Sequence, residues 1–305
     1  MQFELKILGA NSANPVYNRH QTAQFLQIEP YNILIDCGEA TQHQMLRFKV
    51  KIIKIDYIFI SHLHGDHYFG LIGLISTMHL QGRTNDLYLY GPSGLEEIIT
   101  IQLKWSETIL NYKIIFRTLN ASKVETILEN DKFTVETIPL NHRIPACGFL
   151  FKEKPKRRRI NKDKFPPKGS LAHMAMLKQG LDVIDEQGNI LYNNEEFTLA
   201  PKKSRSYAFC SDTRPMTSNI PQLKDIDLLY HEATFMDNMQ DRAITTFHST
   251  AKEAAQFALD CNVQRLIIGH YSSRYKTIEP LLEEAKLVFE NTDLALEGKS
   301  YFIEE

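Results

Sequence analysis

The strongest chemical signal in this 305-residue sequence is a histidine-rich stretch at positions 62–67, with the pattern H-x-H-x-D-H. It directly follows an apolar run, which predicts a strand that leads into a turn. Side chains of extended backbone alternate, so His62 and His64 project to the same side. Asp66 and His67 begin the next segment and can face a second ion close by. The stretch therefore predicts a site for two neighbouring divalent cations.

Other metal-competent residues recur where predicted strands end. Loops at one edge of a sheet can converge such side chains on a single site. The full set of candidate ligands is His62, His64, Asp66, His67, His142, Asp212 and His270. Two ions fit this set if Asp212 bridges them. Because all the donor atoms are nitrogen or oxygen, the set suits zinc and also admits manganese or iron.

Strands and helices alternate along the chain, without the glycine patterns that bind nucleotides. Strands are predicted at 3–8, 25–28, 32–36, 57–60, 87–90, 113–118, 133–139, 148–151, 206–210, 227–230 and 265–268. Helices are predicted to end near 48 and to span 67–81, 94–106 and 279–290, the second of these as one buried helix. Another helix starts after His248, with Ser249 or Thr250 as its cap and Glu253 near its third position. Asp36, which closes a strand, is expected to orient a ligand imidazole.

The composition changes between residues 152 and 168, where nine lysines and arginines face only two acidic residues. We interpret 152–204 as an arm inserted into an otherwise single domain that spans 1–305. A helix at 171–179 and a hairpin around 186–189 are predicted within it. A solvated surface loop would explain the charge. An electrostatic grip on a polyanion would also explain it, because clustered cations neutralise phosphates. The cations assigned to this grip are Lys156, Arg157, Arg158 and Arg159.

Overall composition is that of an ordinary globular protein, with 43% hydrophobic residues and a formal net charge of -2. The four cysteines are widely spaced and form no C-x-x-C pair, which favours reduced thiols in a cytosolic protein. The first residues lack the apolar region of a signal peptide. No apolar run reaches the length of about 18 residues that is needed to span a membrane. These features predict a soluble cytoplasmic protein.

Taken together, the motifs resemble those of a known family. The H-x-H-x-D-H turn with later His, Asp and His ligands resembles the metallo-β-lactamase superfamily, whose fold is an αββα sandwich of the α/β (α+β) class with a dinuclear site at one edge. Four segments make the chain similar to one family within it, ribonuclease Z, whose members cut the 3′ ends of precursor tRNA. These segments are 38–42, 231–234, 248–254 and 269–275.

The resemblance implies two Zn²⁺ per subunit, with Mn²⁺ or Fe²⁺ as alternatives. One ion would be held by His62, His64 and His142, the other by Asp66, His67 and His270, with Asp212 shared. It also implies that Asp66 accepts a proton, and that His248, oriented by Glu232, serves the leaving group. From the residues alone, a structural or helix-capping role for Glu232 and His248 stays open. Ser272 and Arg274 are either phosphate contacts or plain surface.

The resemblance extends to substrate and assembly. The loop 15–20 keeps the Pro and Arg of the family motif P-x-K-x-R-N, so Arg19 is expected to contact RNA. The arm 152–204 corresponds to the part that grips the tRNA elbow away from the cut. A homodimer is implied, in which the arm of one subunit serves the site of the other. No membrane partner is expected.

The expected reaction is attack of a metal-bridging hydroxide on the phosphodiester of precursor tRNA, which leaves a tRNA 3′-hydroxyl and a 5′-phosphorylated trailer. The alternative is a small-molecule phosphodiesterase or other ester hydrolase on the same dinuclear scaffold, because fold does not fix function. The basic arm favours the nuclease. A non-catalytic RNA-binding relative is disfavoured because all seven ligands are present. A β-lactamase is disfavoured because no cysteine stands beside the site.

Overall fold

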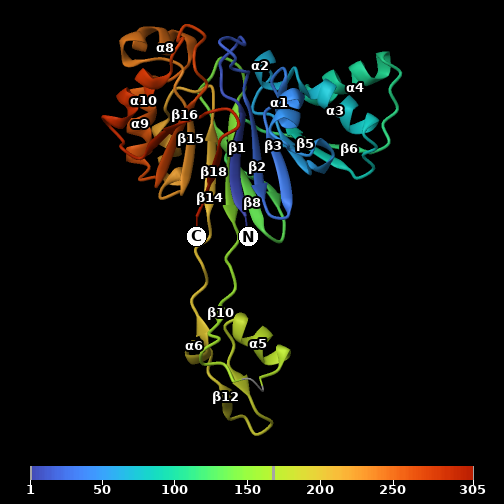
Figure 1. Ribbon diagram of the computed structural model, residues 1–305, viewed down its shortest axis with the longest axis vertical. Helices are drawn as coiled ribbons and strands as arrows, with labels where there is room; N and C mark the ends of the chain where they lie inside the picture. The colour runs from blue at the N-terminus through green and yellow to red at the C-terminus, as the bar shows by residue number, and fades with distance from the viewer. Residues whose placement is uncertain (1, 167–168, 305) are drawn as a thin grey trace. The chain divides into compact units, whose positions relative to one another are not determined.

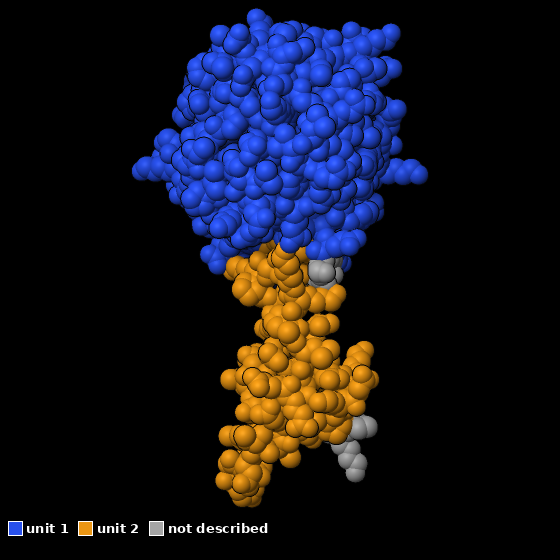
Figure 2. All heavy atoms as spheres, turned by 90° about the vertical axis from the view of Figure 1, so that its left-hand side faces the viewer, with its two compact units in different colours: residues 1–152, 206–304 blue, residues 153–205, 305 orange. Residues whose placement is uncertain are grey.

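The computed structural model describes residues 2–166 and 169–304. Pro167 and Lys168, which belong to the basic segment of the sequence, lie outside the described residues. The chain divides into two compact units, coloured separately in Figure 2: residues up to 152 together with 206–304, and residues 153–205. We call them the main unit and the inserted unit. Within the described residues, no helix is long and apolar enough to cross a membrane.

The main unit contains two sheets, each of seven strands within the described residues. From edge to edge, the first consists of β18 (Ser300–Phe302), β1 (Phe3–Gly9), β2 (Ala23–Ile28), β3 (Tyr31–Ile35), β4 (Tyr57–Phe59), β5 (Leu87–Gly91) and β6 (Ile114–Thr118). The second consists of β17 (Thr292–Leu294), β16 (Arg265–Gly269), β15 (Leu228–Glu232), β14 (Ser206–Cys210), β9 (Cys147–Glu153), β8 (Phe133–Pro139) and β7 (Thr126–Glu129). Strands β3 to β6 and β14 to β17 run parallel, so the carboxyl ends of each group meet at one edge.

The core lies between the two sheets and is rich in aromatic side chains. The ring of Phe59 in the first sheet lies 5.2 Å from that of Phe149 and 5.6 Å from that of Phe151 in the second, measured between centroids. Its neighbours Ile58 and Ile60 point to the opposite face, where they join a second apolar cluster. Strand β4 is therefore buried on both faces, and it delivers the histidine turn from a rigid position.

Helices cover the outer faces of the sheets. In Figure 1, α1 to α4 lie outside the first sheet and α8 to α10 outside the second. The helices of the main unit are α1 (Thr41–Arg47), η1 (Ile52–Lys54), α2 (Gly65–Tyr68), α3 (Leu71–Leu80), α4 (Leu95–Trp105), η2 (Thr217–Asn219), α7 (Ile220–Leu223), η3 (Asp237–Met239), α8 (Gln240–Thr246), α9 (Ala251–Asp260) and α10 (Glu279–Lys286). The expected α9 cap is confirmed: Thr250 and Glu253 form a capping box. The layers are helix, sheet, sheet, helix, which confirms the predicted αββα sandwich.

The single buried helix predicted over 67–81 is wrong. The segment forms α2 and α3, with a break at Gly70. The Gly70 N–H donates to the carbonyl of Cys37 at 2.9 Å, and a Cβ at Gly70 would lie 2.1 Å from the carbonyl oxygen of Gly38. This close approach to the neighbouring loop interrupts the helix. Phe69, an apolar residue of the segment predicted to form this buried helix, is 57% exposed.

The inserted unit has its own small core, in which Phe165, Leu177 and Val183 are buried. Its elements are β10 (Arg159–Ile160), α5 (Leu171–Lys178), β11 (Val183–Ile184), β12 (Ile190–Tyr192), α6 (Asn194–Phe197) and β13 (Thr198–Leu199), with β10 paired to β13 and β11 to β12. The helix predicted at 171–179 and the hairpin around 186–189 are confirmed. Where the unit begins and ends, the guanidinium of Arg205 donates to both carboxylate oxygens of Glu153.

Candidate metal centre

The seven candidate ligands come from four segments of the chain, each of which follows the end of a strand. His62 and His64 follow β4, and Asp66 and His67 lie directly after them in the short helix α2. The other three stand after β8, β14 and β16: His142, Asp212 and His270. The structure brings all seven together at one edge of the two sheets, and their donor atoms fall into two groups, in each of which they lie within 4.8 Å of one another.

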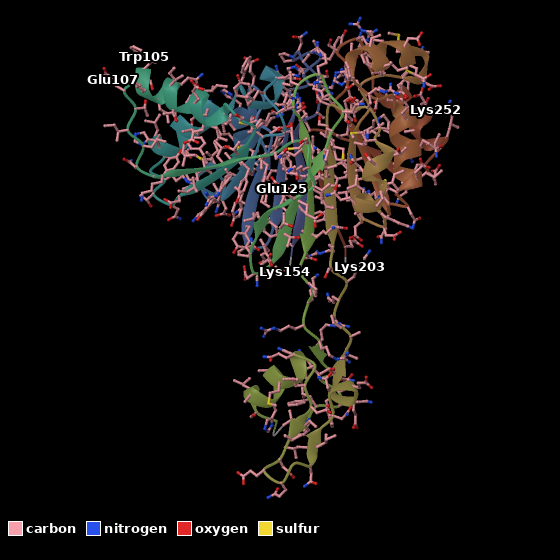
Figure 3. The ribbon with its side chains drawn as sticks, turned by 180° about the vertical axis from the view of Figure 1, so that it is seen from behind. Trp105, Glu107, Glu125, Lys154, Lys203 and Lys252 are labelled. Carbon is pink, nitrogen blue, oxygen red and sulfur yellow. The ribbon has the colours of Figure 1, made fainter. Side chains whose placement is uncertain are left out.

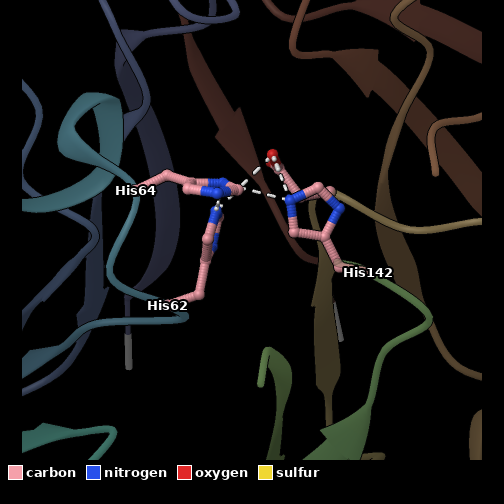
Figure 4. A group of neighbouring side chains, drawn as sticks. His62, His64 and His142 are labelled. Carbon is pink, nitrogen blue, oxygen red and sulfur yellow. Dashed lines mark hydrogen bonds and ion pairs between the residues drawn. The ribbon is translucent and has the colours of Figure 1, made fainter. Parts of the chain in front are cut away.

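The first group consists of His62, His64, His142 and Asp212. The imidazoles of the three histidines point toward one another (Figure 4). Nδ1 of His64 lies 3.0 Å from Nε2 of His62 and 3.1 Å from Nε2 of His142. Oδ2 of Asp212 lies 3.6 Å from the His62 nitrogen and 3.7 Å from the His142 nitrogen. Three imidazole nitrogens and one carboxylate oxygen thus surround one point, as a tetrahedral ion requires.

The second group consists of Asp66, His67 and His270, and Asp212 also faces it. Oδ1 of Asp212 lies 3.1 Å from Nε2 of His67 and 3.0 Å from Nε2 of His270. Oδ2 of Asp66 lies 3.5 Å and 3.7 Å from the same two nitrogens. Each oxygen of the Asp212 carboxylate therefore faces a different set of histidines. This is the geometry of a carboxylate shared between two ion positions.

Two buried atoms test whether a metal fits the second group. Among the described residues, neither Nε2 of His67 nor Nε2 of His270 has a hydrogen-bond partner, although each lies close to a carboxylate oxygen. Burial lowers the pKa of His270, but the facing carboxylate of Asp212 outweighs it and raises that pKa to about 10. The second group thus favours a positive charge, and it offers imidazole nitrogens that lack a hydrogen-bond partner among the described residues. A divalent cation therefore fits the residues present.

The first group is suited to a metal for a different reason. Burial lowers the pKa of His142 to about 4, and burial with the neighbouring His67 holds the pKa of His62 well below its usual range. These imidazoles are neutral near pH 7, which leaves a lone pair for an ion. Burial raises the pKa of Asp212, but His270 and His67 outweigh it and keep the carboxylate ionised.

Residues behind the ligands fix the orientation of the rings. Oδ2 of Asp36 lies 2.6 Å from Nδ1 of His67, as expected for Asp36. Two further residues were not predicted from sequence. The Ser61 hydroxyl donates to Asp36 at 2.9 Å, and the Thr234 hydroxyl lies 3.0 Å from Nδ1 of His270. Ser61 directly precedes His62, and Thr234 lies in the motif segment 231–234, so their places in the sequence pointed to the site. Such partners set which ring nitrogen faces the ion.

Glu232 and His248 form a pair at the rim of the cluster. Strand β15 was expected to stop at Tyr230, but it continues through His231 and Glu232, because it pairs in parallel with β16 as far as Gly269. Nδ1 of His248 lies 2.8 Å from Oε1 of the fully buried Glu232. Burial lowers the pKa of His248, but the Glu232 carboxylate outweighs it and raises that pKa above its ordinary value.

The residues assigned to substrate are spread over three places. Ser272 and Arg274 lie in the loop after His270, where Nε of Arg274 donates to the Ser272 hydroxyl at 3.2 Å and the guanidinium lies 5.2 Å from the centre of the Phe235 ring. Arg19 lies in the loop before β2 and donates to protein groups. The four basic residues Lys156, Arg157, Arg158 and Arg159 belong to the inserted unit. None of them lies in the metal-competent groups found among the described residues.

Comparison with known proteins identifies close relatives. The family model described as Anti-Pycsar protein Apyc1 matches residues 3–155. Ribonuclease Z of Cytophaga hutchinsonii is 52% identical over 305 residues, which are 100% of this chain and 97% of that protein. Ribonuclease Z of Bacteroides fragilis is 43% identical over 298 residues, which are 97% of this chain and 98% of that protein.

Solved structures agree with these relatives. Human tRNase Z, short form, has a TM-score of 0.73 at 26% identity, covering 99% of this chain and 100% of that chain. The metallo-beta-lactamase fold protein YhfI from Bacillus subtilis has a TM-score of 0.69 at 18% identity, covering 99% and 100%, and this likeness shows the fold alone. With identity of this level over its whole length, the chain belongs to the ribonuclease Z family and has the metallo-β-lactamase fold.

Proposed function

We propose that this chain removes the 3′ trailer of precursor tRNA with two divalent metal ions. Zinc is the proposed metal, and manganese and iron are the alternatives. Membership of the ribonuclease Z family makes it an endoribonuclease, a phosphodiester hydrolase. The observation that carries the two-ion proposal is the Asp212 carboxylate, whose two oxygens face two separate histidine sets. Because precursor tRNA is the substrate, we propose that the protein acts in the cytoplasm.

The proposed ligands divide at Asp212. His62, His64 and His142 would hold one ion, and the other would be held by the second set, Asp66, His67 and His270. When bound, such ions polarise the phosphodiester and lower the pKa of a water molecule, so that a nucleophile exists near pH 7. The nitrogen and oxygen donor set, without cysteine, supports zinc, manganese or iron.

The chain's own residues would manage the protons. Asp66 is partly exposed at the edge of the cluster, and its carboxylate accepts the proton of the attacking water. His248 donates a proton to the leaving 3′ oxygen. Glu232 supports that role because it raises the pKa of His248 and holds Nδ1, which leaves Nε2 to face substrate. The donor atoms of His248, Asp212 and His270 also lie within 4.8 Å, so a ligand role is the competing explanation.

The inserted unit is proposed to bind the tRNA away from the cut. A cavity of about 830 Å³ in this unit is lined by apolar and basic side chains, among them Phe165, Met174 and Arg157. Arg157 and Arg159 are exposed, as a phosphate contact requires. Lys156 is less available, because its ammonium forms an ion pair with Glu153 at 2.9 Å.

A homodimer is also proposed, with the apolar surface at the ends of α3 and α4 as the contact. Leu80 is 82% exposed, Ile109 is 86% exposed, and Trp105, which projects from the end of α4 in Figure 3, is 79% exposed. The N–H of Asn111 donates to Nδ1 of His79 at 3.2 Å, which holds the loop after α4 against the end of α3. Large exposed apolar side chains at the ends of two helices favour a protein–protein contact.

Sedimentation of two variants tests the dimer. Trp105→Glu should convert a dimer of wild-type chains into monomers, because it places a charge in the contact. Leu287→Glu is the matched control, since Leu287 is 88% exposed after α10 and outside this surface. A monomeric wild-type protein, or equal behaviour of both variants, would refute the assignment.

Cleavage of a 3′-extended precursor tRNA tests the function. The wild type is compared with a variant in which a short glycine-containing turn replaces residues 154–204. This closure is feasible because the N–H of Glu153 donates to the carbonyl of Arg205 at 2.9 Å. We expect the wild type to cut the precursor, and the shortened variant to cut only a small phosphodiester. Turnover of the small ester by both proteins, with no cut in the precursor, would favour the small-molecule phosphodiesterase instead.

A further inference from the structure

The guanidinium of Arg19 forms hydrogen bonds with other groups of the protein. Nε donates to the side-chain oxygen of Asn11 at 3.0 Å, and the two terminal nitrogens donate to backbone carbonyls, at 2.6 Å to Tyr275 and at 3.3 Å to Lys276. All three nitrogens of the fork are therefore engaged. Because the planar guanidinium meets three fixed acceptors, it determines how these groups are placed relative to one another, which the single ammonium group of a lysine would not do.

These acceptors belong to two loops that flank the metal centre. Asn11 precedes the loop 12–18, and Tyr275 lies in the loop that follows the proposed ligand His270. The loops also pair directly, because the N–H of Ser12 donates to the carbonyl of Tyr271 at 2.9 Å and the N–H of Tyr271 donates to Ala10 at 3.0 Å. Arg19 thus closes a joint between the two loops.

A tight turn places Arg19 for this task. Val16 and Arg19 exchange backbone hydrogen bonds of 2.8 Å and 3.2 Å across Tyr17 and Asn18. Both intervening residues have positive φ, 53° and 61°, as in the two-residue turns that match the twist of a hairpin. The guanidinium also lies 5.4 Å from the centre of the Tyr17 ring. The chain therefore returns Arg19 to the start of its own loop.

The loop that is closed in this way contacts the metal centre through one backbone group. The N–H of Ala13 donates to Oδ2 of Asp66 at 2.8 Å. The same oxygen faces Nε2 of His67 and of His270. Fully buried Asn11 shapes the loop around Ala13, because its amide nitrogen donates to the carbonyls of Ser12 and Asn14 while its oxygen accepts from Arg19.

We infer that Arg19 is a positioning residue for the second metal site, acting through Asn11 and the Ala13 N–H on the carboxylate of Asp66. It fixes the direction from which Asp66 meets the ion position and, through Tyr275, steadies the loop after His270. This inference rests on the proposed function, since it assumes that Asp66 and His270 are ligands. It gives Arg19 a role different from the RNA contact that the sequence resemblance implied.

Lysine at position 19 separates the two roles. Lysine keeps the positive charge, so an RNA contact would survive in Arg19→Lys and fail in Arg19→Ala. Lysine cannot make three hydrogen bonds in one plane, so positioning would fail in both variants. Asn11→Ala breaks the same chain of contacts at its next member. Arg117→Ala is the matched control, because it removes one arginine from the exposed end of β6.

The test is calorimetric titration of the purified, metal-stripped chain with Zn²⁺, alongside its affinity for a precursor tRNA. Circular dichroism confirms that each variant is folded, and Arg19→Lys, the mildest change, serves if Arg19→Ala is not. We expect Arg19→Lys, Arg19→Ala and Asn11→Ala to weaken one of two zinc sites by about 10–100-fold, as loss of an orienting partner does. RNA affinity and the control variant should match the wild type.

Two results would overturn the inference and leave the proposed function intact. One is unchanged affinity at both zinc sites in Arg19→Lys. The other is weaker RNA binding in Arg19→Ala that lysine restores. Failure of the wild type to bind two zinc ions would instead refute the two-ion proposal itself, so the two failures are distinguishable.

Discussion

Replacement of Glu232 by glutamine exchanges one carboxylate oxygen for an amide nitrogen, and it should markedly lower the free energy of unfolding. Oε1 accepts from the N–H of Thr213 at 2.7 Å and lies 2.8 Å from Nδ1 of His248. Oε2 accepts from the N–H of Thr234 at 3.2 Å and from its hydroxyl. Each oxygen thus faces two groups that can donate. A glutamine amide in either orientation points its NH₂ at two of them.

The magnitude follows from this count. Hydrogen bonds to a charged group contribute about 1.5–3 kcal/mol each, so loss of two of them costs about 3–6 kcal/mol of the free energy of unfolding. The site is fully buried, and water cannot replace the missing acceptor. Glu96→Gln, on the exposed first turn of α4, is the control, and such surface changes stay within about 0.5 kcal/mol.

The pH dependence has a defined sign. Burial raises the pKa of Glu232, but His248 outweighs it and lowers that pKa, while the pKa of His248 is raised. The charged pair therefore stabilises the fold between these two values. Its contribution is lost as pH falls through the lowered carboxyl pKa, and as pH rises through the raised imidazole pKa. The cost of Glu232→Gln should shrink at alkaline pH without vanishing, because the bonds to Thr213 and Thr234 are still disrupted.

Urea unfolding of the wild type and both variants, followed by circular dichroism at several pH values, measures this cost. The His248 pKa is followed by NMR in the same proteins, and Glu232→Gln should lower it. A cost of less than about 1 kcal/mol at neutral pH, below that of a single such bond, would refute the reasoning. An unchanged His248 pKa would show that Glu232 does not set its charge.

Three further predictions concern catalysis, metal and RNA. His248→Ala should lower kcat for precursor cleavage by about 10²–10⁴-fold and leave RNA affinity unchanged in a binding assay, whereas parallel losses would exclude the acid role. Asp212→Asn should reduce the zinc bound per chain, measured by atomic emission after dialysis, because one carboxylate faces both ion positions; an unchanged content would contradict the sharing. Arg157→Ala with Arg159→Ala should make RNA affinity less sensitive to salt, with the logarithmic slope falling by about one for each phosphate that these arginines neutralise, and an unchanged slope would place the phosphate-binding residues elsewhere.

The positions of the candidate ligands could be predicted from sequence because each follows a strand whose pattern is clear. Strand β4 is buried on both faces and reads as an uninterrupted apolar run, so the turn at His62 was well defined. Their places beside or within a motif pointed to Ser61 and Thr234, but the partners of these hydroxyls could not be predicted, because a hydroxyl gains its partner only when loops from different elements meet. The contacts of Arg19 were hidden for the same reason: two of its acceptors lie more than 250 residues away.

The errors in the fold have physical causes of the same kind. Gly70 breaks a helical pattern because the loop at Cys37 approaches its backbone, a contact that periodicity cannot encode. Strand β7 was not predicted, because its half-exposed residues show no alternation and it lies at a sheet edge. Strand β15 runs two residues further than its apolar pattern, since parallel pairing to Gly269 keeps His231 and Glu232 extended.

The shape of the metal centre by itself does not distinguish a nuclease from a smaller hydrolase. Structures with this fold at 14–15% identity include a yeast PDE1 and a diphosphatase of the PhnP family, and likeness at that level shows the fold alone. Two further features of this chain favour the nuclease: full-length identity to ribonuclease Z, and an inserted unit with its own core and exposed arginines. A small ester needs only the metals, whereas a folded RNA offers many phosphates at a distance from the cut. Substitutions in the inserted unit should therefore alter the choice of substrate, whereas substitutions of the proposed metal ligands should alter the chemical step.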